Sequence, residues 1–383
     1  MRLLHTSDWH LGRSFHREDM LGAQAAFVDF LVDTVRQQRI DVVVVAGDIY
    51  DRALPAVDAV ALCNDALRRL AATGARVVLI SGNHDSAQRL GFAAELIDAA
   101  GIHLRTDPRR VGEPVLVDDP HGPVALYGIP YLEPEAVRAD LGCDERSHQA
   151  VLAAAMTSIR ADLTTRPGTR SVVLAHAFVT GAQGCESERD ISVGGVAMVP
   201  ASVFDGVDYV ALGHLHGAQA VAPHLRYSGS PLAYSFSEDQ HHKGVLLVDL
   251  PDSPGGEVRV EHLPTPVPRP LARIRGSLDD LLTGPQWQRF ADHYLQVTLT
   301  DAVRPREPME RLRSRFPHVL VLGFAPDERD SDGDGSYAAR VRGRSDLQIA
   351  TDFVAHVRGP ADETEAGLLS EAFEAVRLAQ AGR

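Results

Sequence analysis

The segment VVLISGNHDS (residues 77–86) joins a run of aliphatic residues directly to an amide, an imidazole and a carboxylate. The aliphatic run predicts the end of a buried β-strand, and Gly82 permits a close backbone turn. A structural turn has use for the glycine and the asparagine, but none for His84 and Asp85 side by side. The chain is therefore expected to adopt a fold in which buried strands end in chemically active side chains.

Strand-like and helix-like segments alternate through the first two thirds of the chain. A helical pattern surrounds Phe27, Leu31 and Val35, and a second helix is predicted from Val57 to Ala72. Apolar segments predict buried strands at residues 2–8, 41–48, 76–81, 124–130, 171–176, 207–213 and 243–250. This alternation is typical of an α/β fold.

A proline-rich segment, LPTPVPRP (263–270), can continue neither a helix nor a central strand, and it predicts a stiff linker. Beyond it we expect a smaller α+β region, with strands at 293–301 and 318–324 and helices around Leu281 and Met309. Two helices, broken at RGPADE, are expected from Asp346 onward. The predicted domains are therefore 1–264, 265–345 and 346–383.

One acidic segment, DSDGDGSY (330–337), begins like an EF-hand loop. The twelfth position of that loop would be Val341, where a bidentate Glu is required. We therefore expect an acidic, exposed hairpin loop there.

Composition excludes several classes of protein. The 383-residue chain has a formal net charge of −14, which argues against a general polyanion-binding surface but leaves local basic clusters open. Its three cysteines form no CxxC pair, so a reducing, cytoplasmic compartment is the simple expectation. No apolar run is long enough for a membrane span, and the N-terminus does not resemble a signal peptide. Lys243 is the one lysine of the chain, and all of the other residues counted as Lys or Arg are arginines.

Polar side chains of the metal-binding kind follow the predicted strands in order. They are Asp8, His10, Asp48, Asn83, His176, His214 and His216. Carboxyl ends of strands in an α/β sheet face the usual site of ligand binding. Residues i and i+2 of a strand point the same way, so Asp8/His10 and His214/His216 are each predicted to act as a pincer.

The types of these side chains predict the kind of site. Carboxylate and amide oxygens with imidazole nitrogens suit Mn, Fe or Zn, and the absence of thiolates argues against a structural zinc site. Seven ligands are too many for one ion, so Asp48, in the middle of the set, is the natural bridge between two. Two ions ~3.5–4 Å apart are the arrangement used to hydrolyse phosphate esters.

The motifs DWH, GDIYD, GNHD, the isolated His176 and GHLH resemble the calcineurin-like metallophosphoesterase superfamily in order and approximate spacing. The flanks TSDWHLGRSF and YSGSPLAYSFSED (227–239) narrow the resemblance to the SbcD family, nuclease subunits related to the archaeal and eukaryotic double-strand-break repair nucleases. The resemblance is strong over residues 1–265. It implies a two-sheet metallophosphoesterase sandwich flanked by helices, a smaller capping domain and C-terminal helices.

The resemblance also implies residue roles. Asp8, His10 and His216 would hold one ion with Asp48, and Asn83, His176 and His214 would hold the second, again with Asp48. His84 would act on the leaving group, with Asp85 orienting its imidazole. Asp51 stands where archaeal relatives carry a second histidine. Two divalent ions are implied, with Mn²⁺ preferred, although Fe accepts the same ligands.

The function implied is that of a DNA nuclease subunit, exonucleolytic on duplex ends and endonucleolytic on single-stranded or hairpin DNA, in DNA repair, recombination and replication. Its expected partners are DNA, the SbcC ATPase and a second copy of the chain, within a heterotetramer. The candidate DNA contacts are Arg269, Arg273, Arg275, Arg304, Arg306, Arg311, Arg313 and Arg315. A solvated helix face explains these arginines equally well.

Two other functions fit the same catalytic motifs. The first is a small-molecule or protein phosphoesterase that uses the same dinuclear site, and the second is a non-catalytic scaffold. For the C-terminal helices, packing against their own domain and docking onto SbcC remain open alternatives.

Overall fold

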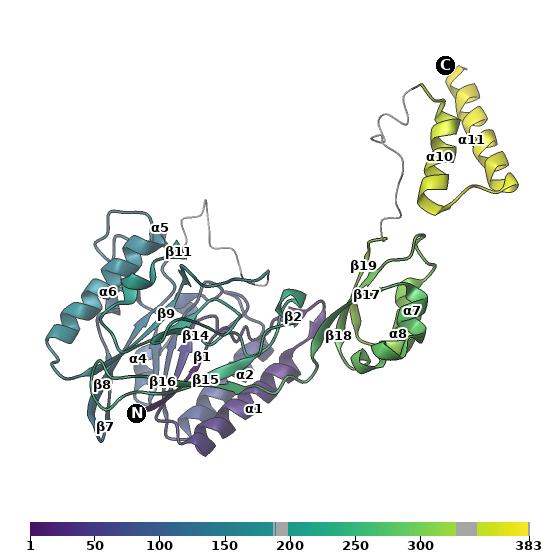
Figure 1. Cartoon of the computed structure of the whole chain (residues 1–383). Coiled ribbons are helices and arrows are strands. Elements are labelled where there is room, and N and C mark those ends of the chain that lie inside the picture. Colours follow the sequence, from purple (N-terminus) through teal and green to yellow (C-terminus); the bar gives the residue numbers. More distant parts are fainter. Residues whose placement is uncertain (187, 189–197, 327–342, 382–383) are drawn as a thin grey trace. The chain divides into compact units, whose positions relative to one another are not determined.

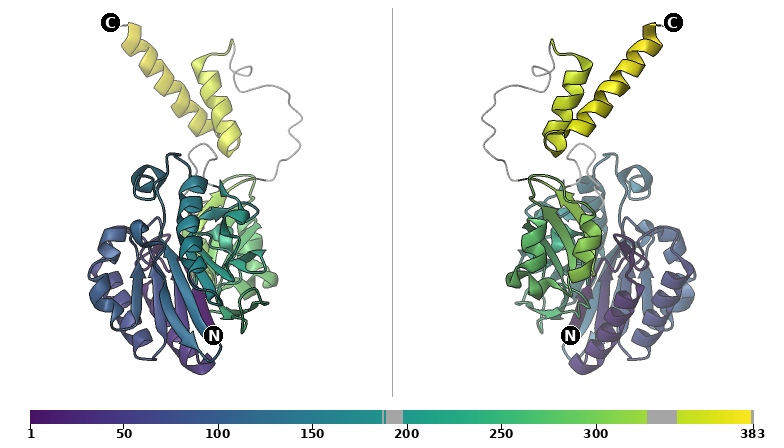
Figure 2. Two further views of the ribbon diagram at one scale, coloured as in Figure 1. Left: turned by 90° about the vertical axis from the view of Figure 1, so that its left-hand side faces the viewer. Right: turned by 90° about the vertical axis from the view of Figure 1, so that its right-hand side faces the viewer.

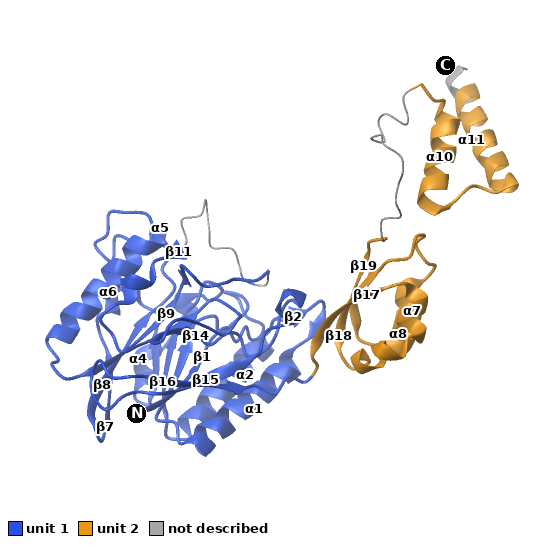
Figure 3. Cartoon of the chain, in the orientation of Figure 1, with its two compact units in different colours: residues 1–268 blue, residues 269–383 orange. Residues whose placement is uncertain are grey.

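The computed structural model describes residues 1–186, 188, 198–326 and 343–381. The chain divides into two compact units, Met1–Pro268 and Arg269–Arg383, and the boundary falls inside the predicted proline-rich linker (Figure 3). The separation of residues 346–383 as a third domain stays a prediction. The acidic segment 330–337, predicted to be an exposed hairpin loop, lies outside the described residues.

Two six-stranded sheets form the first unit (Figure 1). The first sheet has the order β16-β15-β1-β4-β5-β6, and its strands β1, β4, β5 and β6 run parallel. Its bounds are β1 (Arg2–Thr6), β4 (Val42–Ala46), β5 (Arg76–Ile80), β6 (Ile102–Arg105), β15 (Gly244–Asp249) and β16 (Arg259–Pro264). The second sheet has the order β13-β14-β12-β9-β8-β7, with β8, β9, β12 and β14 parallel. Its bounds are β7 (Val115–Asp119), β8 (Gly122–Ile129), β9 (Arg170–His176), β12 (Tyr209–Gly213), β13 (Gln219–Ala222) and β14 (Leu225–Tyr227).

The two sheets pack face to face, and helices cover their outer faces (Figure 2). Val44 and Ile80 of the first sheet share one buried core with Leu126, Leu174 and Ala211 of the second. Helices α1 (Leu21–Gln38) and α2 (Val57–Ala71) pack on the first sheet, and α6 (His148–Thr164) packs on the second. Strands buried on both faces explain the continuous aliphatic runs of the sequence. The predicted two-sheet sandwich flanked by helices is confirmed.

Shorter elements connect the strands and helices of this unit. They are β2 (Ser14–Phe15), β3 (Glu18–Asp19), α3 (Ala87–Leu90), α4 (Ala94–Asp98), η1 (Pro108–Arg110), α5 (Pro134–Val137), β10 (Phe178–Val179), β11 (Met198–Val199), η2 (Ala201–Phe204) and η3 (Phe236–Glu238).

The second unit contains a small parallel sheet and a helical pair. Strands β17 (Leu271–Gly276), β18 (Tyr294–Leu299) and β19 (Val319–Phe324) alternate with α7 (Leu278–Thr283), η4 (Pro285–Phe290) and α8 (Pro308–Arg315). Strand β17 was not predicted from the sequence. Because the three strands run parallel and alternate with helices, this region is α/β and not α+β as expected. Helices α10 (Asp346–Arg358) and α11 (Glu363–Ala381) follow, as predicted. Among the described residues, no helix has the length and apolarity needed to cross a bilayer.

Candidate metal centre

The predicted ligands meet where parallel strands of the two sheets end. Asp48 and Asn83 follow β4 and β5 of the first sheet, whereas His176 ends β9 and His214 follows β12 of the second. All of the predicted ligands are buried except Asn83, which is half-buried. The fold therefore gathers side chains from distant parts of the sequence into one cluster, at the position typical of ligand sites in α/β sheets.

Asp8, His10 and His216 form the first group, with one possible ligand atom of each within 4.8 Å of the others. The Nε2 atoms of His10 and His216 lie 3.0 Å apart. Two ring nitrogens at this distance need a shared cation or proton between their lone pairs. Imidazole nitrogens bind ions such as Zn²⁺ at about 2.0–2.1 Å, so this spacing fits one ion bound by both rings.

Asp48 lies between that group and a second one. Its Oδ2 is 3.7 Å from Nε2 of His10 and 3.5 Å from Nε2 of His176. The Oδ1 of Asn83 is 2.9 Å from Nε2 of His176 and 3.3 Å from Nδ1 of His214. Asp8, Asp48 and His176 also form a buried group of possible ligands. These buried His/Asp groups fit a dinuclear metal site with Asp48 at its centre.

The local geometry of the ligands differs from the predicted strand pincers. β1 ends at Thr6 and β12 ends at Gly213, so the ligands that follow lie beyond the strands. Asp8, His10 and His214 have positive φ angles of 53°, 46° and 102°. Non-glycine residues rarely adopt this region, and strain of this kind concentrates at functional sites. The pincer prediction is wrong in its geometry because the chain turns out of each strand before it presents its ligands.

Glycines allow the two sheets to approach each other at the site. A Cβ on Gly213 would overlap the carbonyl oxygen of Ala46, and a Cβ on Gly82 would overlap the carboxylate of Asp48. Gly47 has a φ of +89°, and a Cβ there would overlap the ring of His176. The loops can therefore pack this closely only because all three positions are glycines.

Burial and mutual charge set the ionisation of the cluster. Burial raises the pKa of Asp8 to about 6 and lowers that of His214 to about 3. Burial also opposes the charge of Asp48, but His176, His10 and His84 hold the pKa of Asp48 well below its usual range. His176 is buried as well, yet Asp48 raises the pKa of His176 to about 9. A divalent ion bound at this pair would displace that proton, because metal ligands must be deprotonated.

His84 lies beside the cluster, but Asp85 does not hold its ring as expected. The Nδ1 of His84 is 2.8 Å from the backbone carbonyl oxygen of Asp51. The carboxylate of Asp85 instead accepts backbone N–H groups of Ile49, Tyr50 and Gly82, at 2.9–3.1 Å. Asp85 thus ties the loop after β4 to the loop after β5, and its predicted role as the orienting partner is corrected. The Nε2 of His84 lies 4.0 Å from Oδ2 of Asp48, on the side of the ring that faces the cluster.

A buried ion pair, not predicted from the sequence, lies behind His216. Glu238 and Lys243 are buried and hydrogen-bonded to each other, and Nδ1 of His216 lies 3.3 Å from Oε1 of Glu238. Burial opposes the charge of Glu238, but Lys243 holds the pKa of Glu238 well below its usual range. Two signals were present in the sequence. Glu238 lies within the quoted motif YSGSPLAYSFSED, and Lys243 is the one lysine of the chain.

The eight candidate DNA-binding arginines all lie in the second unit, and their surroundings differ. Arg273 and Arg275 are exposed on β17, whereas Ala272 and Ile274 of the same strand face the core. Arg275 also donates to the carbonyl oxygen of Ala325 at 3.3 Å. Arg315 is half-buried and donates to the carbonyl oxygens of Leu281 and Gly284, at 3.0 and 2.7 Å. Arg269 donates to the carbonyl oxygen of Asp292 at 3.1 Å and lies 5.0 Å from the ring centre of Tyr294. The remaining exposed members are Arg304, Arg306, Arg311 and Arg313.

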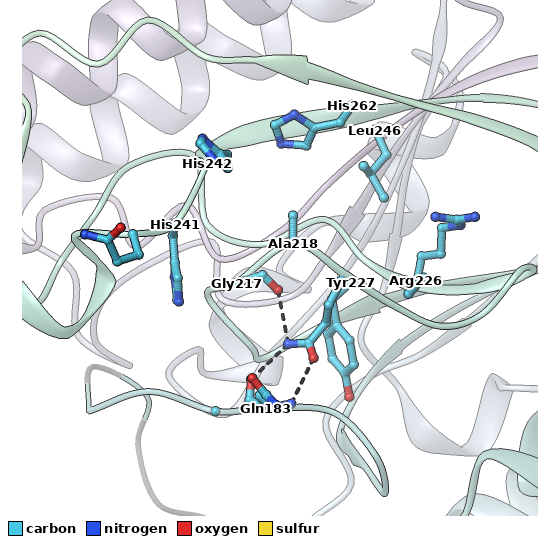
Figure 4. Close-up of a pocket in the computed structure, with 13 residues that line it drawn as sticks. Gln183, Gly217, Ala218, Arg226, Tyr227, His241, His242, Leu246 and His262 are labelled. Atoms are coloured by element: carbon cyan, nitrogen blue, oxygen red, sulfur yellow. Dashed lines mark hydrogen bonds between the residues drawn. The ribbon is translucent and has the colours of Figure 1, made fainter.

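A cavity of about 610 Å³ lies beside the centre, between the β13–β14 and β15–β16 edges of the sheets (Figure 4). The thirteen described residues that line it include His241, His242, His262 and Arg226, and none is acidic. Gly217, which follows His216, forms part of its wall. None of the predicted metal ligands lines this cavity.

Two family profiles match this chain. Residues 1–218, more than half of the chain, match the profile of the calcineurin-like phosphoesterase family. Residues 267–358 match the SbcD C-terminal domain, described as the type 5 capsule protein repressor C-terminal domain. A solved structure of TT1561 from Thermus thermophilus is 15% identical, covering 69% of this chain and 99% of that one, with a TM-score of 0.40. A dimetal phosphatase from Danio rerio is 14% identical, covering 68% and 98%, with a TM-score of 0.39.

Proposed function

This chain belongs to the calcineurin-like phosphoesterase family, and from that premise we propose that it is a metal-dependent DNA nuclease that acts as a subunit with the SbcC ATPase. The observation that carries the proposal is the pairing, in one chain, of a buried His/Asp metal-site candidate with an SbcD C-terminal domain. Hydrolysis of a phosphate ester follows from the family. The proposal goes beyond the family in naming DNA as the substrate.

The metal ligands divide into two sets around Asp48. Asp8, His10 and His216 would hold one ion, and Asn83, His176 and His214 would hold the other. Two divalent ions, with Mn²⁺ as the expected metal, would supply Lewis-acid activation of water and charge stabilisation at the phosphoryl group. The chain's own contribution is to hold the ligands rigidly, with His10 and His214 neutral because burial lowers the pKa of each ring.

His84 is the proposed partner of the leaving group. Its Nδ1 donates to the carbonyl oxygen of Asp51, so the ring is fixed and Nε2 is directed towards the cluster. In its protonated form, the ring would donate a proton from Nε2 to the departing oxygen. Positioned proton donors of this kind typically contribute about 10²–10⁴-fold to rate. Asp85 would act indirectly, through the two loops that it joins.

The second unit would bind DNA and the partner. Exposed arginines such as Arg273 and Arg275 could follow a phosphate backbone. In the helical pair, α10 buries no residue, and Phe353, Val357 and Leu368 are 52–62% exposed. Exposed apolar side chains on one helical hairpin support docking of a partner. We propose SbcC as that partner, in an assembly that contains two copies of each chain.

The decisive experiment is degradation of an end-labelled linear duplex by the purified chain with Mn²⁺, with and without SbcC and ATP. Cleavage that depends on SbcC is the expected result and supports both the nuclease and its role as a subunit. A chain that ignores DNA but hydrolyses a small phosphodiester rapidly is instead a small-molecule or protein phosphoesterase. Ion binding without hydrolysis of any ester would indicate a scaffold.

Removal of the helical pair tests the partner separately. A chain ending at residue 345 should lose SbcC binding in a pull-down and keep Mn²⁺-dependent hydrolysis of a small phosphodiester, because the predicted ligands all lie in the first unit. Retained SbcC binding would contradict the docking proposal and leave the nuclease proposal standing.

A further inference from the structure

Lys243 is the one lysine in a chain with 38 Lys and Arg residues, and its surroundings are unusual for a lysine. Its side chain is 3% exposed, just before the first residue of β15. Lysine is almost never buried this fully unless it is paired, because its charge loses its hydration. The position therefore must supply enough hydrogen bonds to offset that cost.

Three acceptors surround the ammonium group of Lys243. Its Nζ donates to the backbone carbonyl oxygen of His216 at 2.8 Å, to Oγ of Ser230 at 2.9 Å and to Oε2 of Glu238. An ammonium group has three N–H donors, so each acceptor can receive one. A planar guanidinium group with five donors does not match three acceptors gathered around one nitrogen. This geometry explains why the position holds a lysine in a chain that otherwise uses arginine.

The three acceptors come from His216 itself and from two residues, Ser230 and Glu238, that contact it. Lys243 holds the carbonyl oxygen of His216 directly, and the N–H of Ser230 donates to the same oxygen at 3.2 Å. Glu238 reaches the ring itself, because its Oε1 lies 3.3 Å from Nδ1 of His216 and also accepts the N–H of Tyr234 at 3.0 Å. With Nδ1 donating to Glu238, Nε2 keeps its lone pair, and Nε2 is the atom that lies 3.0 Å from Nε2 of His10.

We propose that Lys243 and Glu238 are positioning residues that fix the tautomer and orientation of His216, and so set the affinity of the ion held by Asp8, His10 and His216. The inference rests on the dinuclear site of the proposed function. A carboxylate behind a metal-binding histidine is a general device that raises ligand basicity. The addition here is the buried ammonium, which hydrogen-bonds to that carboxylate and also to the backbone carbonyl oxygen of the ligand.

The test measures ion binding, not cleavage, so that it stands apart from the nuclease proposal. Free Mn²⁺ is titrated with the full chain and followed by electron paramagnetic resonance, which yields the number of bound ions and their affinities. We expect two ions in the wild type. Lys243→Met and Glu238→Gln should each weaken one ion by about 10- to 100-fold and leave the other unchanged.

Arg170→Met is the matched control, because it also removes the cation of a buried ion pair in the same unit. Arg170 is 1% exposed and pairs with Asp119, whose side chain is 7% exposed. It begins β9, whereas the ligand His176 ends that strand, so the pair lies at the end of the strand away from the metal centre. This variant should lose thermal stability and keep both ions at wild-type affinity. The comparison separates ligand positioning from general destabilisation.

The double variant Lys243→Met/Glu238→Gln keeps the test decisive if either single variant does not fold. It removes both charges together and leaves an amide oxygen opposite Nδ1 of His216, so folding should recover. We expect one ion to stay weakened in the folded double variant. Two ions at wild-type affinity in that variant, or in Lys243→Met, would overturn the inference. A wild type that binds two ions but cleaves no DNA would instead contradict the proposed function and leave this inference intact.

Discussion

At the scale of single residues, the centre is built by backbone as much as by side chains. A backbone carbonyl, that of Asp51, holds the ring of His84. The Asp51 side chain is thereby left for other contacts, and its Oδ1 lies 3.7 Å from Nε of Arg13 and 4.0 Å from Nδ1 of His10. The orientation of His84 therefore does not depend on which side chain occupies position 51.

The variant His84→Ala tests the role of this ring. We expect both Mn²⁺ ions to bind as in the wild type, because His84 belongs to neither proposed ligand set. Hydrolysis of a phosphodiester should fall by about 10²–10⁴-fold, the usual contribution of a positioned proton donor. Steady-state turnover and ion stoichiometry are measured on the same preparation. Near-normal turnover in this variant would remove His84 from the mechanism.

The glycines provide a second test at this scale. Gly82→Ala would drive a Cβ into the carboxylate and backbone of Asp48, so we expect lost ion binding and a lower melting temperature. Gly22→Ala is the control, because no atom lies within 4 Å of a Cβ at that position in α1. It should be neutral or stabilise the protein by up to about 1 kcal/mol through helix propensity. Thermal melts and Mn²⁺ titrations compare the two variants.

At the scale of elements, the small sheet of the second unit separates arginines that look alike in the sequence. Strand alternation on β17 buries Ala272 and Ile274 and exposes Arg273 and Arg275. Arg315 instead has a structural role, since it satisfies carbonyl oxygens at the end of α7. The two kinds of arginine should therefore respond differently to mutation.

The salt dependence of DNA binding distinguishes the two kinds of arginine. If Arg273 and Arg275 each contact a phosphate, the double variant Arg273→Ala/Arg275→Ala should weaken duplex binding and reduce the magnitude of the slope of log K against log salt by about 2. Arg315→Ala should lower the melting temperature and leave that slope unchanged. The measurement is a set of binding isotherms at several salt concentrations. An unchanged slope in the double variant would exclude these two arginines as phosphate contacts.

At the scale of the first unit as a whole, a buried charge network ties the N-terminus to the second sheet. Asp119 pairs with Arg170 and with the amino group of Met1, and Arg170 also donates to the carbonyl oxygens of Pro251 and Gly122, at 3.1 and 2.8 Å. Met1 precedes the first sheet, whereas Asp119 and Arg170 belong to the second. The network therefore joins the two layers of the sandwich.

This network predicts a pH-dependent contribution to stability. Hydrogen bonds from Arg170 hold the pKa of Asp119 well below its usual range, and the unfolded value is about 3.9. A carboxyl group whose pKa is lower in the folded state than in the unfolded state stabilises the protein at pH values above the unfolded pKa. This contribution is lost as the pH falls towards the pKa of the folded state. Asp119→Asn should therefore lower the melting temperature clearly at pH 7. The difference from the wild type should narrow below about pH 4. A difference that does not change with pH would show that the charge of Asp119 is not what stabilises the fold.

The sequence by itself determined the α/β alternation and the residue types of the centre. Short β-branched runs such as VVVVA favour buried strands. A glycine followed by Asp, Asn or His at the end of such a run is likewise visible in the local sequence. These features depend on neighbours in the chain, so they can be predicted from it.

Tertiary structure decided which groups touch. The left-handed turns at Asp8 and His10, the carbonyl of Asp51 behind His84 and the pair of Glu238 with Lys243 behind His216 all depend on how separate loops pack together. Likewise, the exposure of Arg273 depends on a strand, β17, that its sequence pattern did not indicate. The capping role of Arg315 depends on how the end of α8 packs against the end of α7. Hydrogen bonds between distant segments leave no periodicity in the sequence, and for that reason only the folded structure assigns them.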